Sequence, residues 1–244
     1  YDITPYIKYG EDNLICVRAD ATLEEGWFYE GAGIYRDVWL EKSAEVSVAP
    51  FGIFVYAELK APFSEAKLKI ETEVSNSSLK PQLCEVTQRL LDADGKEIAS
   101  STSTTLGLKS KETVTTKQSI SITRPHLWSI SDPYLYKVET TISQNGKIVD
   151  VYTTTTGIRD IAFSSEQGFL LNGKPLKLKG VNMHQDHAGV GSAIPDVLQA
   201  WRIKQLKAFG CNAYRASHNP MTPALLDICD REGILVIDEN RLMG

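Results

Sequence analysis

The chain has 244 residues and a mass of 27.0 kDa; 42% of its residues are hydrophobic and 23% are charged. This composition excludes a disordered or collagen-like protein and predicts a folded chain with a sizeable core. Its 31 acidic and 26 basic residues give a formal net charge of -5, so no basic excess is available to neutralise nucleic-acid phosphates or an anionic membrane. No apolar run approaches the roughly 18 residues of a membrane span, and residues 1–10 do not resemble a signal peptide. We therefore expect neither nucleic acid nor a membrane as a partner, and assign no compartment.

The cysteines stand singly along the sequence, with no CxxC pair and no histidine at the spacing of a zinc site. We interpret them as free and mostly buried thiols. They are Cys16, Cys84, Cys211 and Cys229.

Residues 1–42 are predicted to contain two strands, at 13–20 and 33–41, joined by a polar loop. Two to three strands are too few to close a sandwich. We therefore interpret this region as the end of a domain that begins before Tyr1.

Residues 43–157 alternate polar and apolar side chains, which is typical of strands with one exposed face. Turn signals stand at Asp94-Gly95 and Asn145-Gly146. Short strands with turns at this spacing predict an immunoglobulin-like sandwich. Trp128 is expected in its core or as a plug at one end. Seven strands are expected, at 45–48, 51–60, 67–75, 84–91, 114–122, 134–143 and 147–155.

Residues 158–244 change to a strand–helix pattern, which predicts the start of a parallel α/β array. A closed (β/α)8 barrel needs ~250 residues, whereas 87 residues follow Gly157. We therefore interpret the chain as a fragment of a larger modular protein. The expected elements are a hairpin at 172–174, a buried strand at 176–182, a helix from Pro195 to Gly210 with Leu198, Trp201, Leu206 and Phe209 on its apolar face, a strand at 212–217, a helix at 222–232 and a strand at 234–237.

Polar side chains gather where these three predicted strands end. In parallel α/β folds, the carboxyl ends of the strands carry the reactive groups, because loops converge there. The first strand delivers Asn182, His184, Asp186 and His187, the second Arg215, Ser217, His218 and Asn219, and the third Asp238, Glu239 and Asn240.

Three kinds of site could use this cluster. A sugar site needs neutral donors for hydroxyl groups and two carboxyl groups that flank the scissile bond. A metal site could use His184 and His187 with Asp186 and His218, although HxxH on a loop is a weak motif.

Nucleophilic catalysis has less support from the sequence. Ser217 lacks the GxSxG elbow, and Cys211 lies at the wrong end of its strand. Asp238 and Glu239 are adjacent on a strand and point to opposite faces, so at most one of them points into a barrel. We interpret that one as structural or binding.

Three blocks of the sequence together resemble glycoside hydrolase family 2, the family of β-galactosidases and β-glucuronidases. The first is WFYEGAGIYRDVWL at 27–40, and the second is RPHLWSISDPYLY at 124–136. The third combines LKGVNMHQD at 178–186, NAYRASHNP at 212–220 and VIDEN at 236–240. They occur in the family's domain order and span nearly the whole chain.

The resemblance implies a multi-domain fold, with an all-β immunoglobulin-like sandwich between the end of a jelly-roll sugar-binding domain and the first strands of a TIM barrel. The implied domains are 1–42 for the jelly roll, 43–157 for the sandwich and 158–244 for the barrel.

The same resemblance implies retaining hydrolysis of a β-linked sugar, with β-galactosides favoured and β-glucuronide or β-mannoside specificity as alternatives. Family members carry both catalytic glutamates on later barrel strands, beyond Gly244, so we expect no catalytic pair in this chain and no activity of the chain alone. The resemblance implies sugar-facing residues in this chain: His184 and His218 match histidines that contact the glycone, and Arg215 matches an arginine that orients the nucleophile. Asp186 and Asn219 are further expected contacts.

Two departures from the family pattern limit the comparison. Glu24 or Glu25 stands where some galactosidases bring an acidic residue to the glycone. After Glu239 the chain reads Asn-Arg-Leu-Met, without the carboxylate and histidine that hold magnesium in some members. No metal and no cofactor are therefore expected, while a homo-oligomer of the parent is possible on the family's pattern.

A rival interpretation is a non-catalytic carbohydrate-binding or scaffolding module, whose platform would be the aromatic loop Trp27, Phe28 and Tyr29. Packing of that loop against the barrel is the simpler interpretation. A metallohydrolase is a second rival.

Overall fold

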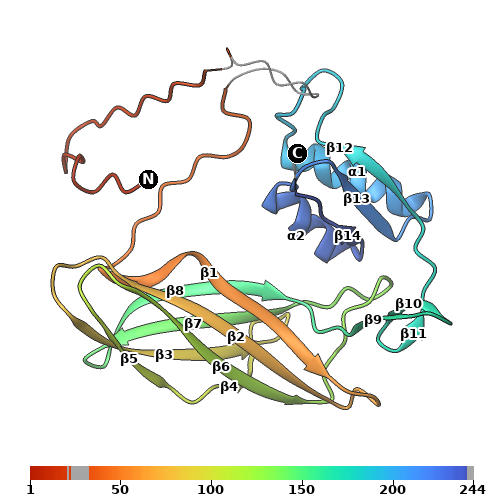
Figure 1. The fold of residues 1–244 in the computed structure, drawn as a ribbon, viewed down its shortest axis with the longest axis horizontal. Coiled ribbons are helices and arrows are strands. Elements are labelled where there is room, and N and C mark those ends of the chain that lie inside the picture. The colour runs from red at the N-terminus through yellow and green to blue at the C-terminus, as the bar shows by residue number, and fades with distance from the viewer. Residues whose placement is uncertain (21, 23–32, 241–244) are drawn as a thin grey trace. The chain divides into compact units, whose positions relative to one another are not determined.

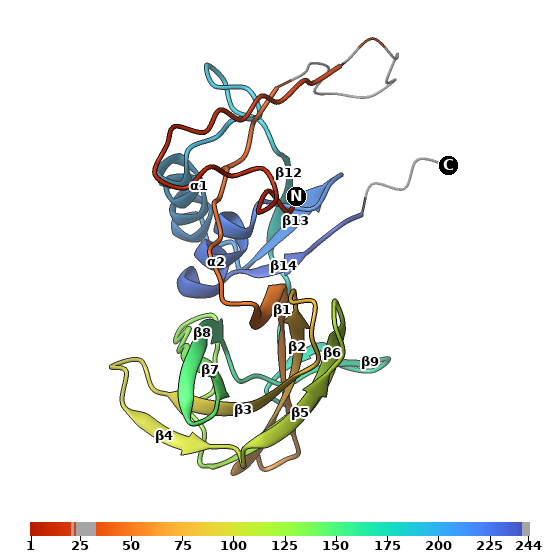
Figure 2. The ribbon, with the colours of Figure 1, turned by 90° about the vertical axis from the view of Figure 1, so that its left-hand side faces the viewer.

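Strands β1 to β8 form two facing antiparallel sheets in the computed structural model, which describes residues 1–20, 22 and 33–240 (Figures 1 and 2). One sheet has the order β1-β2-β6, and the other has the order β4-β3-β7-β8, with β5 also paired to β3. The strands are β1 (Val46–Leu59), β2 (Glu65–Asn76), β3 (Gln82–Leu91), β4 (Glu97–Ser100), β5 (Thr104–Leu108), β6 (Thr113–Thr123), β7 (Tyr136–Gln144) and β8 (Lys147–Thr156).

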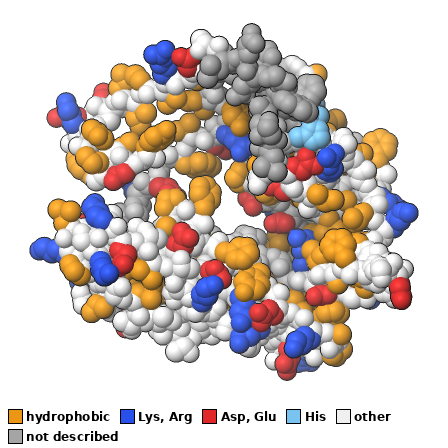
Figure 3. Space-filling view, viewed as in Figure 1, with side chains coloured by type: hydrophobic (Ala, Val, Ile, Leu, Met, Phe, Trp, Pro, Cys, Tyr) orange, Lys and Arg blue, Asp and Glu red, His pale blue; other side chains and the backbone are white. Residues whose placement is uncertain are grey.

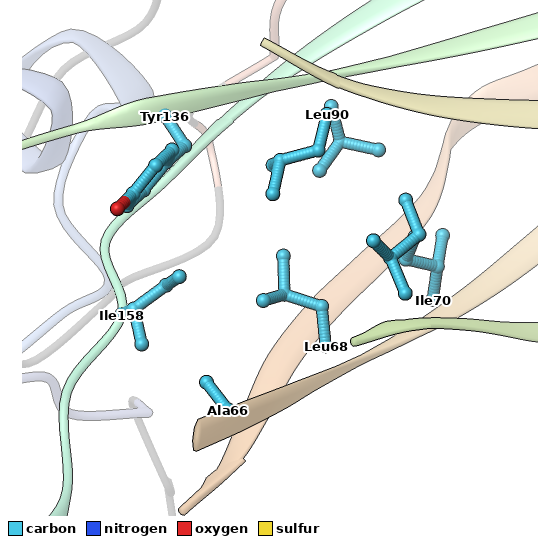
Figure 4. Close-up of a cluster of buried hydrophobic side chains, with 8 residues drawn as sticks. Ala66, Leu68, Ile70, Leu90, Tyr136 and Ile158 are labelled. Carbon is cyan, nitrogen blue, oxygen red and sulfur yellow. The ribbon is translucent and has the colours of Figure 1, made fainter. Parts of the chain in front are cut away.

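The core of this sandwich comes from the alternate residues that each sheet turns inward. In β2, Leu68, Ile70 and Val74 are at most 1% exposed, while Lys67 and Glu73, at alternate positions of the strand, face water. Leu68 and Ile70 meet Leu90 and Tyr136 of the opposite sheet (Figure 4). The predicted immunoglobulin-like sandwich is therefore confirmed, and the period of two in the sequence is its cause.

A buried polar cluster crosses the sandwich between two apolar clusters. The Gln88 side chain, which is 0% exposed, donates to Thr72 Oγ1 at 3.0 Å and to Gln118 Oε1 at 3.1 Å. Its own Oε1 accepts from Thr140 Oγ1 at 2.6 Å, and Gln118 donates to the Val86 carbonyl at 3.1 Å. These bonds satisfy groups that would otherwise be costly to bury.

The strand predictions differ from the structure in two places. The segments expected at 45–48 and 51–60 are one strand, β1, whose pairing with β2 shifts register between Val48 and Ile53. The short strands β4 and β5 were missed, because four or five residues give too little alternation to register as a pattern. The Asn145-Gly146 hairpin is confirmed, with positive φ at both residues.

A small antiparallel sheet, β9 (Ile161–Ser164), β10 (Gly168–Leu171) and β11 (Lys174–Pro175), follows the sandwich. A parallel sheet in the order β12-β13-β14 comes next, with α1 and α2 on one of its faces (Figure 2). Its elements are β12 (Gly180–His184), α1 (Asp196–Ala208), β13 (Ala213–Ser217), α2 (Pro223–Glu232) and β14 (Leu235–Ile237).

The boundaries of α2 follow from its sequence. Thr222 is the N-cap and its Oγ1 accepts from the Leu225 N–H, Pro223 occupies the first turn, and Gly233 ends the helix at a φ of 73°. These are the residues that favour the start and end of a helix, and both predicted boundaries are confirmed.

Two predictions for this region were wrong in part. The apolar face expected for α1 was right for Leu206, which packs against the buried cluster shared with α2. It was wrong for Trp201 and for Phe209, which follows the helix; they are 54% and 86% exposed, and Gln199 and Ile203 are buried instead. Successive helix residues lie about 100° apart around the axis, so Ile203 lies on a different side of α1 from Trp201. The strand expected at 176–182 begins only at Gly180, and its first residues are exposed because β12 pairs on one side, with β13.

The described chain divides into two compact units, 1–38 with 186–194, and 39–185 with 195–244. In the smaller unit, the segments expected as strands at 13–20 and 33–41 are not strands. Leu14, Ile15 and Val17 are 66–90% exposed there. An extended segment becomes a strand only when a neighbour takes up its backbone hydrogen bonds, and no described residue pairs with these segments in a ladder. The aromatic loop and the Glu24–Glu25 pair lie outside the described residues.

The three domain boundaries stay a prediction. The cysteine prediction was right in part: all four are free, with Cys84 and Cys229 buried, Cys211 half-buried and Cys16 exposed. Among the described residues, no helix has the length and apolar character that a membrane crossing requires.

Candidate glycone-binding rim

The parallel sheet has a helix-covered face and an open face, and strand alternation assigns each residue to one of them. Tyr214 and Ala216 of β13 pack into the helix cluster, whereas Ala213 packs on the other face with Trp128. Arg215 and Ser217 therefore share the face of Ala213. The register places Asn182 opposite Arg215 and His184 opposite Ser217 across the neighbouring strand.

The amino end of this open face is closed by a buried apolar cluster. Ala213 and Leu235 begin β13 and β14, and they pack with Trp128 and with Leu171 of β10. Trp128 is therefore a plug at the joint of the sandwich and the sheet, one of its two expected positions. The polar side chains lie at the opposite, carboxyl end of the strands, as predicted.

Glu239 is the centre of the polar group at that end. Its Oε1 lies 2.5 Å from Arg215 Nε, and its Oε2 lies 2.9 Å from His218 Nδ1. The hydrogen bond from His218, together with the charge of Arg215, lowers the pKa of the Glu239 carboxyl. The group therefore holds a carboxylate rather than a carboxylic acid.

His184 joins the same group through its ring. The rings of His184 and His218 lie edge to face, with centroids 5.2 Å apart and planes at 86°. The His184 carbonyl also accepts from Arg202 Nη2 of α1 at 3.5 Å, and the Ser217–His218 peptide bond is cis. Strands β12 and β13 and the residues that follow β14 thus bring His184, Arg215, His218 and Glu239 together; we call these four residues the rim.

The adjacent carboxyls Asp238 and Glu239 separate as strand alternation requires. Asp238 Oδ1 accepts from the Met221 N–H at 3.4 Å, whereas Glu239 meets Arg215 and His218. Glu239 was missing from the expected sugar contacts, and the signal that could have found it is its even-numbered spacing, four residues, from Leu235, which puts both on the open face.

The other candidate residues are placed as follows. Asn219 is half-buried and directly follows His218. Asp186 is exposed and begins the segment 186–194, which belongs to the smaller unit with His187. His187 and Gly191 form a tight turn, in which the Gly191 N–H donates to the His187 carbonyl at 2.9 Å.

The structure also bears on the rival chemistries. No cluster of three or more His, Cys, Asp or Glu side chains able to hold a metal ion occurs within 1–20, 22 and 33–240. The Ser217 side chain is buried, at 1% exposure, and Cys211 is half-buried at the amino end of β13. Acidic and basic side chains are interspersed on the face of the sandwich shown in Figure 3, as the near-balanced composition predicts.

The fold is an immunoglobulin-like sandwich followed by the start of a TIM-barrel domain, and the rim lies at the carboxyl end of the parallel strands of that domain. The family model of glycosyl hydrolases family 2 matches residues 46–159, and the TIM barrel domain model of the same family matches residues 163–244. The chain belongs to glycoside hydrolase family 2.

Known proteins similar to the chain include enzymes of two named specificities. The β-galactosidase BoGH2A of Bacteroides ovatus is 39% identical over 98% of this chain, and a β-glucuronidase of Bacteroides fragilis is 31% identical over 100% of it. The crystal structure of a family 2 member from Bacteroides cellulosilyticus superimposes with a TM-score of 0.91 at 36% identity over 98% of the chain. The chain spans 28% to 36% of the length of these three proteins.

Proposed function

We propose that this chain is part of a retaining β-glycoside hydrolase, and that His184, Arg215 and His218 of the rim contact the glycone of its substrate. The observation that carries the proposal is the Glu239 carboxylate held between Arg215 and His218 at the carboxyl end of a parallel sheet. Asp186 and Asn219 are proposed as further contacts.

The chemistry of the rim suits a sugar. Imidazole nitrogens donate or accept hydrogen bonds according to the tautomer, and a guanidinium donates several. Together they can form hydrogen bonds with the hydroxyl groups of a sugar ring. The side chains of Arg215 and His218 are 43% and 45% exposed, which leaves surface for a ligand to contact.

The bond-breaking carboxyls are proposed to come from a part of the protein outside this chain. Retaining hydrolysis needs two carboxyl groups about 5–5.5 Å apart, one as acid and base and the other as nucleophile. Glu239 contacts the Arg215 guanidinium and the His218 ring, and its pKa is lowered. A general acid requires a raised pKa instead.

A neutral glycone is favoured over a uronic acid at this rim. A glucuronide carboxylate would need a cation, and the rim's cation, Arg215, already pairs with Glu239. This supports the assignment to β-galactosides or related neutral β-glycosides.

The test is hydrolysis of a panel of 4-nitrophenyl β-glycosides by this chain and by the full-length protein that contains it. We expect hydrolysis by the full-length protein, with galactoside preferred over glucuronide and the β-anomer released first, and no hydrolysis by the chain alone. Turnover by the chain would contradict the assignment of catalysis to other parts of the protein. Release of the α-anomer, or no hydrolysis of any β-glycoside, would refute the proposed function.

A further inference from the structure

We propose that Glu239 is a positioning residue: it fixes His218 as the Nδ1–H tautomer and holds the guanidinium of Arg215, so that both present a defined hydrogen-bonding edge to a sugar hydroxyl. The inference deepens the proposed function and rests on it for the identity of the ligand. Its structural part, which is the His218 tautomer and the contacts of Glu239 with Arg215 and His218, depends only on the observed geometry.

The first support is the division of one carboxylate between two partners. Oε1 contacts Arg215 Nε at 2.5 Å and Oε2 contacts His218 Nδ1 at 2.9 Å. Arg215 lies in β13, His218 directly follows that strand, and Glu239 follows β14. One side chain that follows β14 thus fixes the directions of two side chains in and directly after β13.

The second support is the proton balance of the pair. A carboxylate oxygen only accepts hydrogen bonds, so His218 Nδ1 must carry the proton in this contact. In the neutral ring with its proton on Nδ1, Nε2 is an acceptor, which suits a hydroxyl donor.

The third support is the lower exposure of the Glu239 side chain compared with the side chains that it binds. Its side chain is 21% exposed, about half the exposure of the Arg215 and His218 side chains. The carboxylate is therefore more deeply placed than the groups it binds. A side chain in this position acts on a ligand through Arg215 and His218 rather than by direct contact.

The structural part is tested by NMR of this chain labelled with 15N-histidine. We expect the His218 ring to show a protonated Nδ1 and an unprotonated Nε2 at neutral pH. The pattern is expected to be lost in Glu239→Ala and retained in the control Asp238→Ala, whose carboxyl lies on the other face. A wild-type ring with its proton on Nε2 would overturn the proposal.

The functional part is tested by kinetics of the full-length protein with an aryl β-galactoside. Glu239→Gln is expected to lower kcat/KM on the order of 10- to 100-fold, because misdirected contact groups lose transition-state binding. The double variant with His218→Asn should lose less than the product of the two single losses, since both changes break one unit.

The outcomes separate the two proposals. Losses that multiply would mean that Glu239 acts independently of His218, and the positioning role would be wrong. Absence of any glycosidase activity in the wild type would refute the proposed function while leaving the NMR result to decide the tautomer. An unchanged melting temperature in Glu239→Gln excludes loss of folding as the cause.

Discussion

Trp128 Nε1 donates a hydrogen bond to the backbone carbonyl of Asp230 at 2.8 Å, which ties the segment after β6 to the last turn of α2. The guanidinium of Arg159 lies 4.7 Å from the Trp128 ring on its face, and the Trp128 carbonyl accepts from Asn172 Nδ2 at 3.0 Å. Through its indole, Trp128 contacts Arg159 and α2, and through its backbone carbonyl it binds Asn172 of the linking hairpin. This joint fixes the amino end of the sheet whose other end carries the rim.

Trp128→Phe removes the indole N–H and leaves a cavity at this buried position. We expect a destabilisation of about 1–3 kcal/mol, because the Asp230 carbonyl loses its partner and the surrounding apolar side chains lose contacts. Urea unfolding measures it. The control Trp201→Phe, at a side chain that is 54% exposed on α1, should change the free energy of unfolding by less than about 0.5 kcal/mol. Equal effects of the two variants would contradict the role of the joint.

Gly233 and Gly210 offer a matched test of the close contact at the same joint. Both follow a helix at positive φ, 73° and 86°, but a Cβ on Gly233 would lie 2.3 Å from the Ile130 carbonyl oxygen, whereas a Cβ on Gly210 meets open space. Gly210→Ala should cost about 1–2 kcal/mol, from the left-handed conformation alone. Gly233→Ala should cost about 1–3 kcal/mol more, from the backbone clash. Thermal unfolding of both variants gives the difference, and similar values would show that the contact is absent in solution.

The polar cluster in the sandwich predicts a large penalty for Gln88→Leu. The substitution leaves Thr72, Gln118 and Thr140 without their shared partner, and each unsatisfied buried group costs about 1–3 kcal/mol. We expect at least about 3 kcal/mol by chemical denaturation. Glu85→Leu, at an exposed position of the same strand, serves as the control and should be nearly neutral. A neutral Gln88→Leu would mean that water or another side chain satisfies the cluster.

The hydrogen bond from His218 predicts the pH behaviour of Glu239. Because the pKa of this carboxyl is lowered in the folded chain, its contribution to stability is present above the ordinary glutamate pKa and is lost as pH falls through the lowered value. A 13C titration of the Glu239 carboxyl should show a midpoint below the ordinary range. In His218→Ala the midpoint should rise toward that range, and an unmoved midpoint would show that His218 is not the main cause.

The sequence predicted the sandwich and the strand–helix order because both depend on local signals. Alternation in β2, the Asn145-Gly146 turn and the Thr222-Pro223 and Gly233 boundaries of α2 act within a few residues. The strands expected near the amino terminus were wrong, because a strand forms only with a pairing partner. Trp201 and Phe209 were wrongly assigned to the buried face of α1, because the surface against which a helix packs decides which of its sides is buried.

The rim was predictable in part. Strand ends indicated His184, Arg215 and His218, and the structure brings these three together. Their convergence on Glu239 was not predicted, because it depends on the parallel register between β13 and β14. Asp186 follows β12 in sequence but belongs to the other compact unit, so its part in the site remains a prediction.

The most direct test of the glycone-binding rim is the kcat/KM of the full-length protein for 4-nitrophenyl β-galactoside with Arg215→Met. We predict a loss on the order of 100-fold or more, as expected for a charged donor that stabilises the transition state. The control Arg89→Met removes an arginine that pairs with Glu139 on the sandwich and should leave kcat/KM unchanged. Full activity of Arg215→Met would contradict the assignment of this rim to substrate binding.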